Sequence, residues 1–498
     1  MSAAAARATW MGHPRGLATL FFTEMWERFS YYGMRALLLL YMTAALNAGG
    51  LGMSDVQGGA VFGLFTAAAY LANLPGGWIA DRVLGQRRSV FWGGVLISAG
   101  NFALAIPAGM TTFYLGLLII CLGTGMLKTN CSTLVGALYE GESGSRRDAA
   151  FSIYYVGINL GALSPLVVGT IGETVGYRWG FLVGGVGMVL GLIQYHLTGK
   201  WLGDAGVAPH PAAPREHKRA QRLLTGSLVA LGVLVLLTIA GLLPIGVVQL
   251  ANVTGVAMIA LAIAFFGNVL LFGKLATAEK KSVAVIAIFF VCAAVFWAGY
   301  EQAGSTLNLF ARDHTDRSFL GSWFASGQHP VSWYQIAQAV FVLGFAPVFA
   351  WIWISLGRRG RDPSAGAKFG LGLLQLGLSF LVMMVAAQTV LRTGHKVLPI
   401  WLIVTYLLQT TGEMCLSPIG LSNVTKLAPA RYSAQMMGTW FLGAAIGNLA
   451  AGLIGGEIGS DVADMPAQFL RMALIGTVSG FIMLALARPV RAWMGAAR

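Results

Sequence analysis

Long apolar runs separated by short polar segments repeat along the whole of this chain. Many runs reach the ~20 residues that a helix rising ~1.5 Å per residue needs to cross about 30 Å of hydrocarbon. The run from Leu228 to Leu243 is apolar nearly throughout and shows no alternation of polar and apolar positions. The strands of a transmembrane barrel would alternate over ~10 residues. The pattern therefore predicts membrane-spanning helices.

The spacing of the runs predicts six helices, a polar segment, two helices and six further helices. We place them at about 17–46, 56–80, 88–108, 111–138, 148–172, 178–201, 223–244, 249–273, 282–303, 333–355, 368–391, 397–422, 433–456 and 465–488. The polar segment 202–222 is rich in proline and charge, which predicts a linker.

The fold class that follows is an all-α membrane protein with fourteen spans. The predicted domains are an N-terminal six-helix bundle (1–202), a basic linker with two additional transmembrane helices (203–281) and a C-terminal six-helix bundle (282–498). Two six-helix halves predict a transport site between them. The alternative is that the halves are unrelated and that their equal helix number is a coincidence.

Charge is sparse and unevenly distributed. Only 10% of the residues are charged, against roughly 25% in soluble domains, although the net charge is +14. If the amino terminus is cytoplasmic, most Lys and Arg fall on the cytoplasmic side, as the positive-inside rule requires. We therefore expect a multi-pass protein of the cell inner membrane with both termini in the cytoplasm, and the positive charge indicates topology, not nucleic-acid binding.

Several other classes of protein lack support in the sequence. Residues 1–14 hold no apolar core with a cleavage-type site, so we expect no signal peptide. Each of the four cysteines lies inside an apolar run and they form no metal-like spacing, so we expect no disulfide framework, metal site or cofactor. The motifs GxxxxGK[ST], GxSxG and HExxH do not occur, which argues against a nucleotide-driven pump and against an enzyme with catalytic residues.

Ionisable residues nevertheless occur well inside the predicted spans. They are Glu24, Glu27, Arg28, Arg35, Lys128, Glu301 and Glu413. At about 2.5–3.5 kcal/mol for each charge at the centre of a span, they would together cost on the order of 20 kcal/mol if they faced lipid. We therefore expect these side chains to pair in a polar interior. The alternative is that individual pairs only hold helices together.

The first span carries most of this charge on one face. Glu24, Arg28, Tyr31 and Arg35 follow one another at intervals of four, three and four residues, and Glu27 lies beside them. Aromatic residues share the charged spans, and they either pack, lie at the membrane interface or form pocket walls. They are Tyr31, Tyr32, Tyr70, Tyr154, Tyr155, Trp297 and Trp440.

These residues carry a family resemblance. The segment from Glu24 to Gly33 resembles the ExxERFxYYG motif of the proton-dependent oligopeptide transporters, a branch of the major facilitator superfamily. Further segments are similar to family motifs and follow in the family's order along nearly the whole chain. They are GWIADRVLGQRR (77–88), FSIYYVGINLG (151–161), FWAGYEQAGS (296–305) and EMCLSPIGLSNVTKLAP (413–429). Two additional helices after a basic linker are also typical of bacterial members.

The resemblance implies a role for each of several residues. Those that would line a peptide site are Tyr31, Tyr32, Arg35, Tyr70, Lys128, Asn159, Trp297, Gln338, Glu413, Ser417 and Trp440, and those that would couple it to protons are Glu24, Glu27, Arg28, Glu301 and Arg35. Lys128 and Arg35 would lie near the peptide carboxylate, and Glu413 near its amino group. Gln338 stands in a span where the family often has asparagine and proline, and it would replace that asparagine.

The implied function is proton-coupled import of di- and tripeptides by alternating access, by a monomer in contact with membrane lipid. Residues 60–80 of the second span lack the histidine that some members carry there, so carboxylates must carry the proton. The family analogy pairs Arg35 with Glu301 and Lys128 with Glu413. Two alternatives remain open: a facilitator for another small solute such as nitrate or a drug, and a peptide sensor that does not transport.

Overall fold

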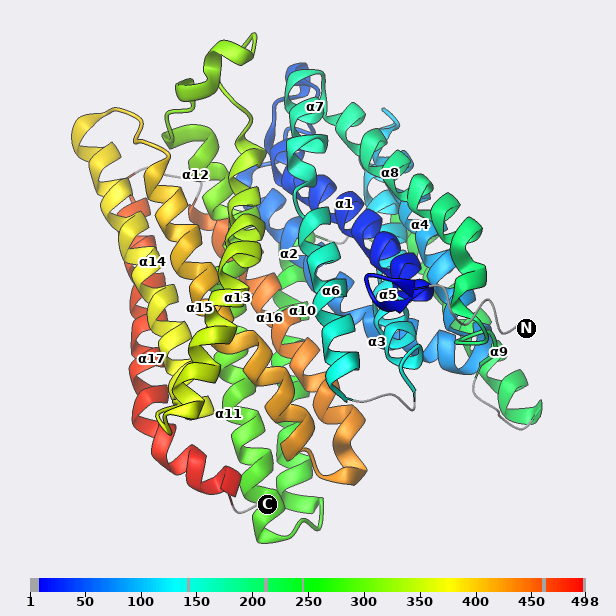
Figure 1. The fold of residues 1–498 in the computed structure, drawn as a ribbon. Helices are drawn as coiled ribbons and strands as arrows, with labels where there is room; N and C mark the ends of the chain where they lie inside the picture. Colours follow the sequence, from blue (N-terminus) through cyan, green and yellow to red (C-terminus); the bar gives the residue numbers. More distant parts are fainter. Residues whose placement is uncertain (1–8, 141–143, 210–213, 244–245, 459–462, 496–498) are drawn as a thin grey trace. The chain divides into compact units, whose positions relative to one another are not determined.

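The protein is described by a computed structural model that covers residues 9–140, 144–209, 214–243, 246–458 and 463–495. The chain divides into two compact units (Figure 1). Unit 1 consists of Met1–Leu37 and Leu71–Gly246, and unit 2 of Leu38–Tyr70 and Val247–Arg498. Nearly all of the described residues are helical, and a short antiparallel pair, β1 (Thr9–Trp10) and β2 (His13–Pro14), precedes the first helix.

Unit 1 is a helical bundle. It holds the first part of α1 (Arg15–Thr43), α3 (Asn73–Ile79), α4 (Gln86–Ala105), α5 (Met110–Ala137), α6 (Gly144–Gly161), α7 (Val168–Thr174), α8 (Tyr177–Thr198) and α9 (Pro214–Ile239). Helix α4 packs against α5 and α8, and α3 packs against α5. Leu17, Leu127 and Met188 belong to its fully buried apolar core.

Glycine allows α4 and α5 to approach backbone to backbone. A Cβ atom on Gly93 would lie 2.7 Å from the Gly123 carbonyl oxygen, and one on Gly123 would lie 2.6 Å from the Gly93 oxygen. Between membrane helices the driving force for association is close packing rather than exclusion of water, so small residues mark the contact.

Unit 2 contains the end of α1 and nine further α-helices among its described residues. They are α2 (Asp55–Leu71), α10 (Val247–Phe272), α11 (Thr277–Tyr300), α12 (Thr306–His314), α13 (Ile336–Arg358), α14 (Ala365–Thr393), α15 (Ile400–Leu427), α16 (Ser433–Ile458) and α17 (Met465–Gly495), with the 3-10 helix Leu46–Ala48 between α1 and α2. Helix α14 packs against α15 and α17, and α11 packs against α16.

Helices α2 and α16 also meet within unit 2, again through glycine. A Cβ atom on Gly59 would lie 2.4 Å from the Gly452 carbonyl oxygen, and one on Gly452 would lie 2.4 Å from the Gly63 nitrogen. Near the same end of α2, Arg312 of α12 donates a 2.7 Å hydrogen bond to the Thr43 hydroxyl and lies 3.9 Å from the Asp55 carboxylate. The start of α2 is therefore fixed to both α12 and α16.

Several long helices are interrupted. The 3-10 helix Ser164–Leu166 separates α6 from α7, and the 3-10 helix Glu301–Gly304 separates α11 from α12. A π-helical turn, Ala80–Leu84, follows α3, and the remaining 3-10 helices are Gly199–Leu202, Ser318–Trp323, Val331–Gln335 and Ala430–Tyr432. Interruptions at membrane depth are tolerated where the backbone faces protein or a polar cavity. One of them places Glu301 at the point where α11 ends.

Long helices occupy every range in which the sequence predicts a span. Among the described residues, eleven helical segments are long and apolar enough to cross a membrane. The other ranges are filled by α1, α4 and α15, which are 20 to 29 residues long. Helix α1 is more polar because it carries four of the seven charges found inside the predicted spans.

The predicted linker is wrong at its second half. Helix α9 begins at Pro214, so residues 215–222 are helical, and His217 of α9 hydrogen-bonds the Arg82 carbonyl oxygen at 3.0 Å. The high charge of this segment predicts a linker, but polar residues also form the solvated first turns of a helix that enters a membrane. Residues 1–8, 210–213 and 244, on which parts of the sequence predictions fall, lie outside the described residues.

Candidate functional site

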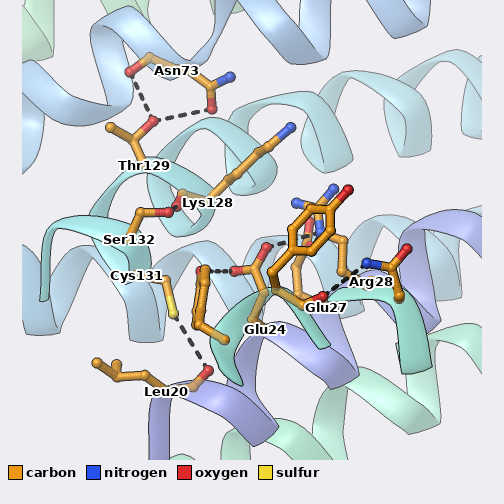
Figure 2. Close-up of polar contacts among 12 residues, drawn as sticks. Leu20, Glu24, Glu27, Arg28, Asn73, Lys128, Thr129, Cys131 and Ser132 are labelled. Carbon is orange, nitrogen blue, oxygen red and sulfur yellow. Dashed lines mark hydrogen bonds and ion pairs between the residues drawn. The ribbon is translucent and has the colours of Figure 1, made fainter. Parts of the chain in front are cut away.

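A buried cluster of carboxylates around one arginine lies on α1 in unit 1 (Figure 2). The Nε atom of Arg28 lies 3.0 Å from Glu24 Oε1 and 2.5 Å from Glu27 Oε2. The relative exposures of Glu24, Glu27 and Arg28 are 1%, 0% and 3%. Glu24 and Arg28 are one helical turn apart and form the ion pair that this spacing allows. Glu27 is adjacent in sequence, and adjacent side chains on a helix do not normally face each other, so the Arg28 side chain bends to reach it.

Tyr154 of α6 completes this cluster. Its hydroxyl donates a 2.6 Å hydrogen bond to Glu24 Oε2, so each Glu24 oxygen has one partner. The sequence placed Tyr154 only among the aromatic residues that share charged spans. Its hydrogen bond to Glu24 joins two residues that are 130 positions apart in the sequence, so no local sequence pattern could have shown this contact.

The cluster leaves polar atoms unsatisfied. Arg28 Nη2 and Glu27 Oε1 are buried and, within the part of the chain described here, have no hydrogen-bond partner. The Arg28 guanidinium lies 5.5 Å from the centroid of the Tyr31 ring and 5.9 Å from that of Tyr32. A buried carboxylate with an unused oxygen is costly as an anion, and protonation or a ligand would relieve that cost.

Lys128 on α5 belongs to the same neighbourhood (Figure 2). It is half-buried and lies within electrostatic range of Glu27. Thr129, the next residue, donates a 3.2 Å hydrogen bond to Asn73 Oδ1 of α3, which fixes α5 beside α3. Unit 1 therefore places two carboxylates and two cations in one region, as expected for residues that pair away from lipid.

Other predicted site residues of unit 1 occupy the same helices. Arg35 on α1 is 8% exposed and Asn159 on α6 is 6% exposed. The Asn159 side-chain nitrogen donates a 2.9 Å hydrogen bond to the carbonyl oxygen of Tyr155, one turn earlier.

Unit 2 holds the remaining predicted site residues. The side chains of Glu413 on α15 and Tyr300 on α11 are hydrogen-bonded, and Glu301 lies within electrostatic range of Glu413. Trp297 lies one turn before Glu301, and its ring centroid is 5.3 Å from that of Tyr300. The other predicted members in this unit are Tyr70 on α2, Gln338 on α13, Ser417 on α15 and Trp440 on α16.

The sequence missed a second polar group on α15. Gln409 and Thr410 are fully buried, and both amide atoms of Gln409 lack a hydrogen-bond partner within the described ranges. Glu413 follows Gln409 by one turn, so these residues extend the polar face of α15. Uncharged polar residues in an apolar run carry a weak signal, which is why charge alone did not identify them.

The structure brings together the residues within each unit. It groups Glu24, Glu27, Arg28 and Lys128 in unit 1, and Glu301 and Glu413 in unit 2. The pairs Arg35–Glu301 and Lys128–Glu413 each join residues of different units, and they stay predictions. Among the described residues, no group of three His, Cys, Asp or Glu side chains is arranged to hold a metal ion.

The sequence model of the POT family matches residues 87–458 of the chain. The chain belongs to the POT family. It is therefore a multi-pass membrane transporter rather than an enzyme, in agreement with its apolar helices.

Named relatives of this POT-family chain are similar over their whole length. The chain is 39% identical to the peptide transporter YePEPT of Yersinia enterocolitica, in an alignment that covers 98% of this chain and 96% of that protein. It is 36% identical to a di-/tripeptide transporter of Lactococcus lactis, covering 98% of each.

Solved structures of POT transporters have the same fold. The crystal structure of a peptide transporter POT in complex with sulfate superimposes with a TM-score of 0.89 at 41% identity, covering 98% of each chain. A POT family transporter in complex with 5-aminolevulinic acid gives a TM-score of 0.87 at 33% identity, covering 97% of this chain and 98% of that one.

Proposed function

We propose that this chain is a proton-coupled symporter that imports di- and tripeptides across the inner membrane by alternating access. The observation that carries the proposal is the buried cluster of Glu24, Glu27 and Arg28 on α1, held by Tyr154. Ionisable groups at membrane depth mark substrate or proton pathways, because their burial costs too much to persist without use. The relatives named as peptide transporters support peptide as the cargo.

The chemistry of the predicted site residues suits a peptide of any sequence. Such a peptide offers a carboxylate, an ammonium group and an amide backbone as its only constant features. Lys128 and Arg35 would attract the carboxylate, Glu413 the ammonium group and Asn159 the backbone. The surrounding walls would be formed by Tyr31, Tyr32, Tyr70, Trp297, Gln338, Ser417 and Trp440.

Proton coupling would act through carboxylates that change partners. A proton on Glu301, with Glu24 or Glu27 taking part, would weaken the attraction to Arg35, and a bound peptide would engage Lys128 and Glu413. Glu301 lies where α11 ends and the 3-10 helix Glu301–Gly304 begins, so the α-helix is interrupted at this residue. Broken helices at the binding site are a recurrent feature of secondary transporters.

The energetics are sufficient without ATP. One proton that moves with a net-neutral peptide carries one charge, worth about 2.3 kcal/mol per 100 mV. At 100 mV this free energy supports roughly fiftyfold accumulation of peptide.

The proposed topology completes the assignment. Fourteen spans would be arranged as six, two and six, with the domains at 1–202, 203–281 and 282–498 and both termini in the cytoplasm. The protein would function as a monomer surrounded by lipid.

The test is uptake of a labelled dipeptide into proteoliposomes under an imposed proton gradient. We expect wild type to concentrate the peptide, and Glu301→Gln to retain peptide counterflow while losing gradient-driven accumulation. Glu140→Gln, which neutralises an exposed carboxylate outside the helices, is the matched control and should behave as wild type. If Glu301→Gln concentrates peptide as well as wild type, Glu301 does not couple the proton.

One observation favours a second cargo. A POT transporter at 33% identity binds 5-aminolevulinic acid, which is a small amino acid rather than a peptide. Competition distinguishes the two cargos, because a peptide site is blocked by di- and tripeptides at lower concentrations than by single zwitterions. Absence of counterflow for every compound would instead indicate a sensor.

A further inference from the structure

A small basic pocket lies in unit 1, and none of its lining residues belongs to the buried α1 cluster. It has a volume of about 220 Å³ and is formed by the start of α4 and the end of α8 with the 3-10 helix that follows. Its lining residues are Arg87, Arg88, Phe91, Trp92, Tyr195, His196, Gly199 and Leu202. None of these eight residues is acidic, and two are arginines.

The two arginines lie at a helix end whose own partial charge is positive. Arg87 and Arg88 lie in the first turn of α4, where the helix dipole is already positive and where no acidic residue is present. Cations at this end of a helix are unfavourable unless an anion is nearby. An anion in the pocket would offset both the arginines and the dipole.

Arg87 is held in place by the protein but retains a free donor. One of its guanidinium nitrogens, Nη2, donates to the Gly203 carbonyl oxygen, and its own carbonyl oxygen accepts a 3.2 Å bond from the Tyr195 hydroxyl. Its Nε atom is buried without a hydrogen-bond partner among the described residues. The neighbouring Arg88 is exposed.

The surroundings of the pocket resemble a membrane interface. Trp92 is 52% exposed and Trp201, next to the pocket residue Leu202, is 38% exposed. Along α8, Ile193 and Leu197 are also exposed. Tryptophan is enriched at the level of the lipid headgroups, and exposed aliphatic residues of a membrane helix contact acyl chains. The elements that form the pocket therefore carry the exposed aromatic and aliphatic side chains that a lipid headgroup and acyl chain would contact.

We propose that this pocket binds a phosphate group, with Arg87 and Arg88 as its ligands. The adjoining apolar surface favours the phosphodiester of an anionic membrane lipid over free phosphate in water. Basic pockets between membrane helices are suited to such headgroups, and each Lys or Arg near the membrane surface contributes about fivefold in affinity. The site is independent of the cargo that the transporter carries.

The experiment measures lipid retention by native mass spectrometry of the full chain released from nanodiscs. The discs contain phosphatidylcholine with or without phosphatidylglycerol, and the variants are Arg88→Gln, Arg87→Gln and the control Arg359→Gln. Arg359 is an exposed arginine that directly follows α13 and does not line the pocket. We expect phosphatidylglycerol to be retained about fivefold less by Arg88→Gln, and normally by Arg359→Gln.

A second arm identifies the source of the phosphate. Inorganic phosphate is titrated against the protein in pure phosphatidylcholine discs, and the midpoint of thermal unfolding is recorded. One result would support the phosphate site but assign it to the aqueous ion. In it, inorganic phosphate stabilises wild type but not Arg88→Gln, and wild type shows no preference for phosphatidylglycerol.

The proposal is overturned if neither anion depends on Arg88, or if Arg359→Gln loses the lipid to the same extent. Because Arg87 also bonds the Gly203 backbone, Arg87→Gln could unfold this region. Arg88→Gln, whose side chain is exposed, therefore decides the outcome.

Discussion

Adding a single methyl group at the glycine contact between α2 and α16 should separate these two helices of unit 2. In Gly59→Ala, the new Cβ atom would lie 2.4 Å from the Gly452 carbonyl oxygen and 2.7 Å from the Gly456 nitrogen. Ordinary contacts of a Cβ atom begin at 3.4 Å, so the two backbones must separate by up to about 1 Å. Both neighbours are backbone atoms, which cannot rotate away.

The cost can be estimated from overpacking in well-packed cores, which is typically about 1–3 kcal/mol. If α2 and α16 part during transport, this cost falls only on the arrangement in which they touch. The population of that arrangement would then fall by about 5- to 150-fold relative to one in which they are separated. Proton-driven uptake should slow, because each cycle must pass through both arrangements.

The assay is a distance measurement by electron paramagnetic resonance. Nitroxide labels are placed on either side of this contact. One is at Leu46, which is 76% exposed and lies in the 3-10 helix before α2, and the other is at Glu457, which is exposed and lies at the end of α16. We expect Gly59→Ala to add a population at longer distance. Gly267→Ala on α10 is the control, because its Cβ atom would meet nothing within 4 Å. An unchanged distance distribution together with normal uptake in Gly59→Ala would refute the reasoning.

Three further predictions concern individual side chains. Tyr154→Phe removes the hydroxyl that bonds Glu24 and should destabilise the protein by about 1–3 kcal/mol in thermal unfolding. The control Tyr114→Phe, at a tyrosine that is 38% exposed, should leave the stability nearly unchanged. Arg28→Gln leaves buried carboxylates without their cation, so it should lower the free energy of unfolding by about 3–5 kcal/mol and abolish uptake. A variant with normal stability and normal uptake would contradict this prediction. His329 bonds the Arg317 carbonyl oxygen and the Tyr334 hydroxyl, and its burial and the nearby Arg317 lower its pKa. Since the folded pKa lies below the ordinary value of about 6.5, this loop should lose stability as the pH falls through that value. Protection factors for hydrogen exchange around residue 329, which correct for the slower intrinsic exchange in acid, should therefore fall at pH 5.5 in wild type but not in His329→Gln.

The helices of this protein were predictable because their signal is local. A run of apolar residues long enough to cross a bilayer can satisfy its backbone only as a helix, whatever surrounds it. Long helices therefore occupy all the predicted ranges. The segment that begins α9 was misread because a charged, proline-containing sequence is compatible with both a linker and a solvated helix start.

The charged face of α1 was predictable in part for the same reason. The spacing between Glu24 and Arg28 is a property of the helix, and their ion pair needs no other element. The contact of Arg28 with Glu27 goes against that periodicity, and it depends on burial by neighbouring helices. The small residues of α2 and α16 likewise carry no sequence signal that says which helix each one meets.

The sequence by itself determined the class of protein, the positions of the long helices and the ionisable residues that are costly to expose to lipid, because hydrophobicity and helical spacing act within about twenty residues. Only the tertiary structure decided that Tyr154 holds Glu24, that Gly59 meets Gly452 and that two arginines line a pocket between α4 and α8. Each of these depends on atoms brought together from distant parts of the chain. Close packing between helices selects such partners by shape, and shape is not written in any one segment.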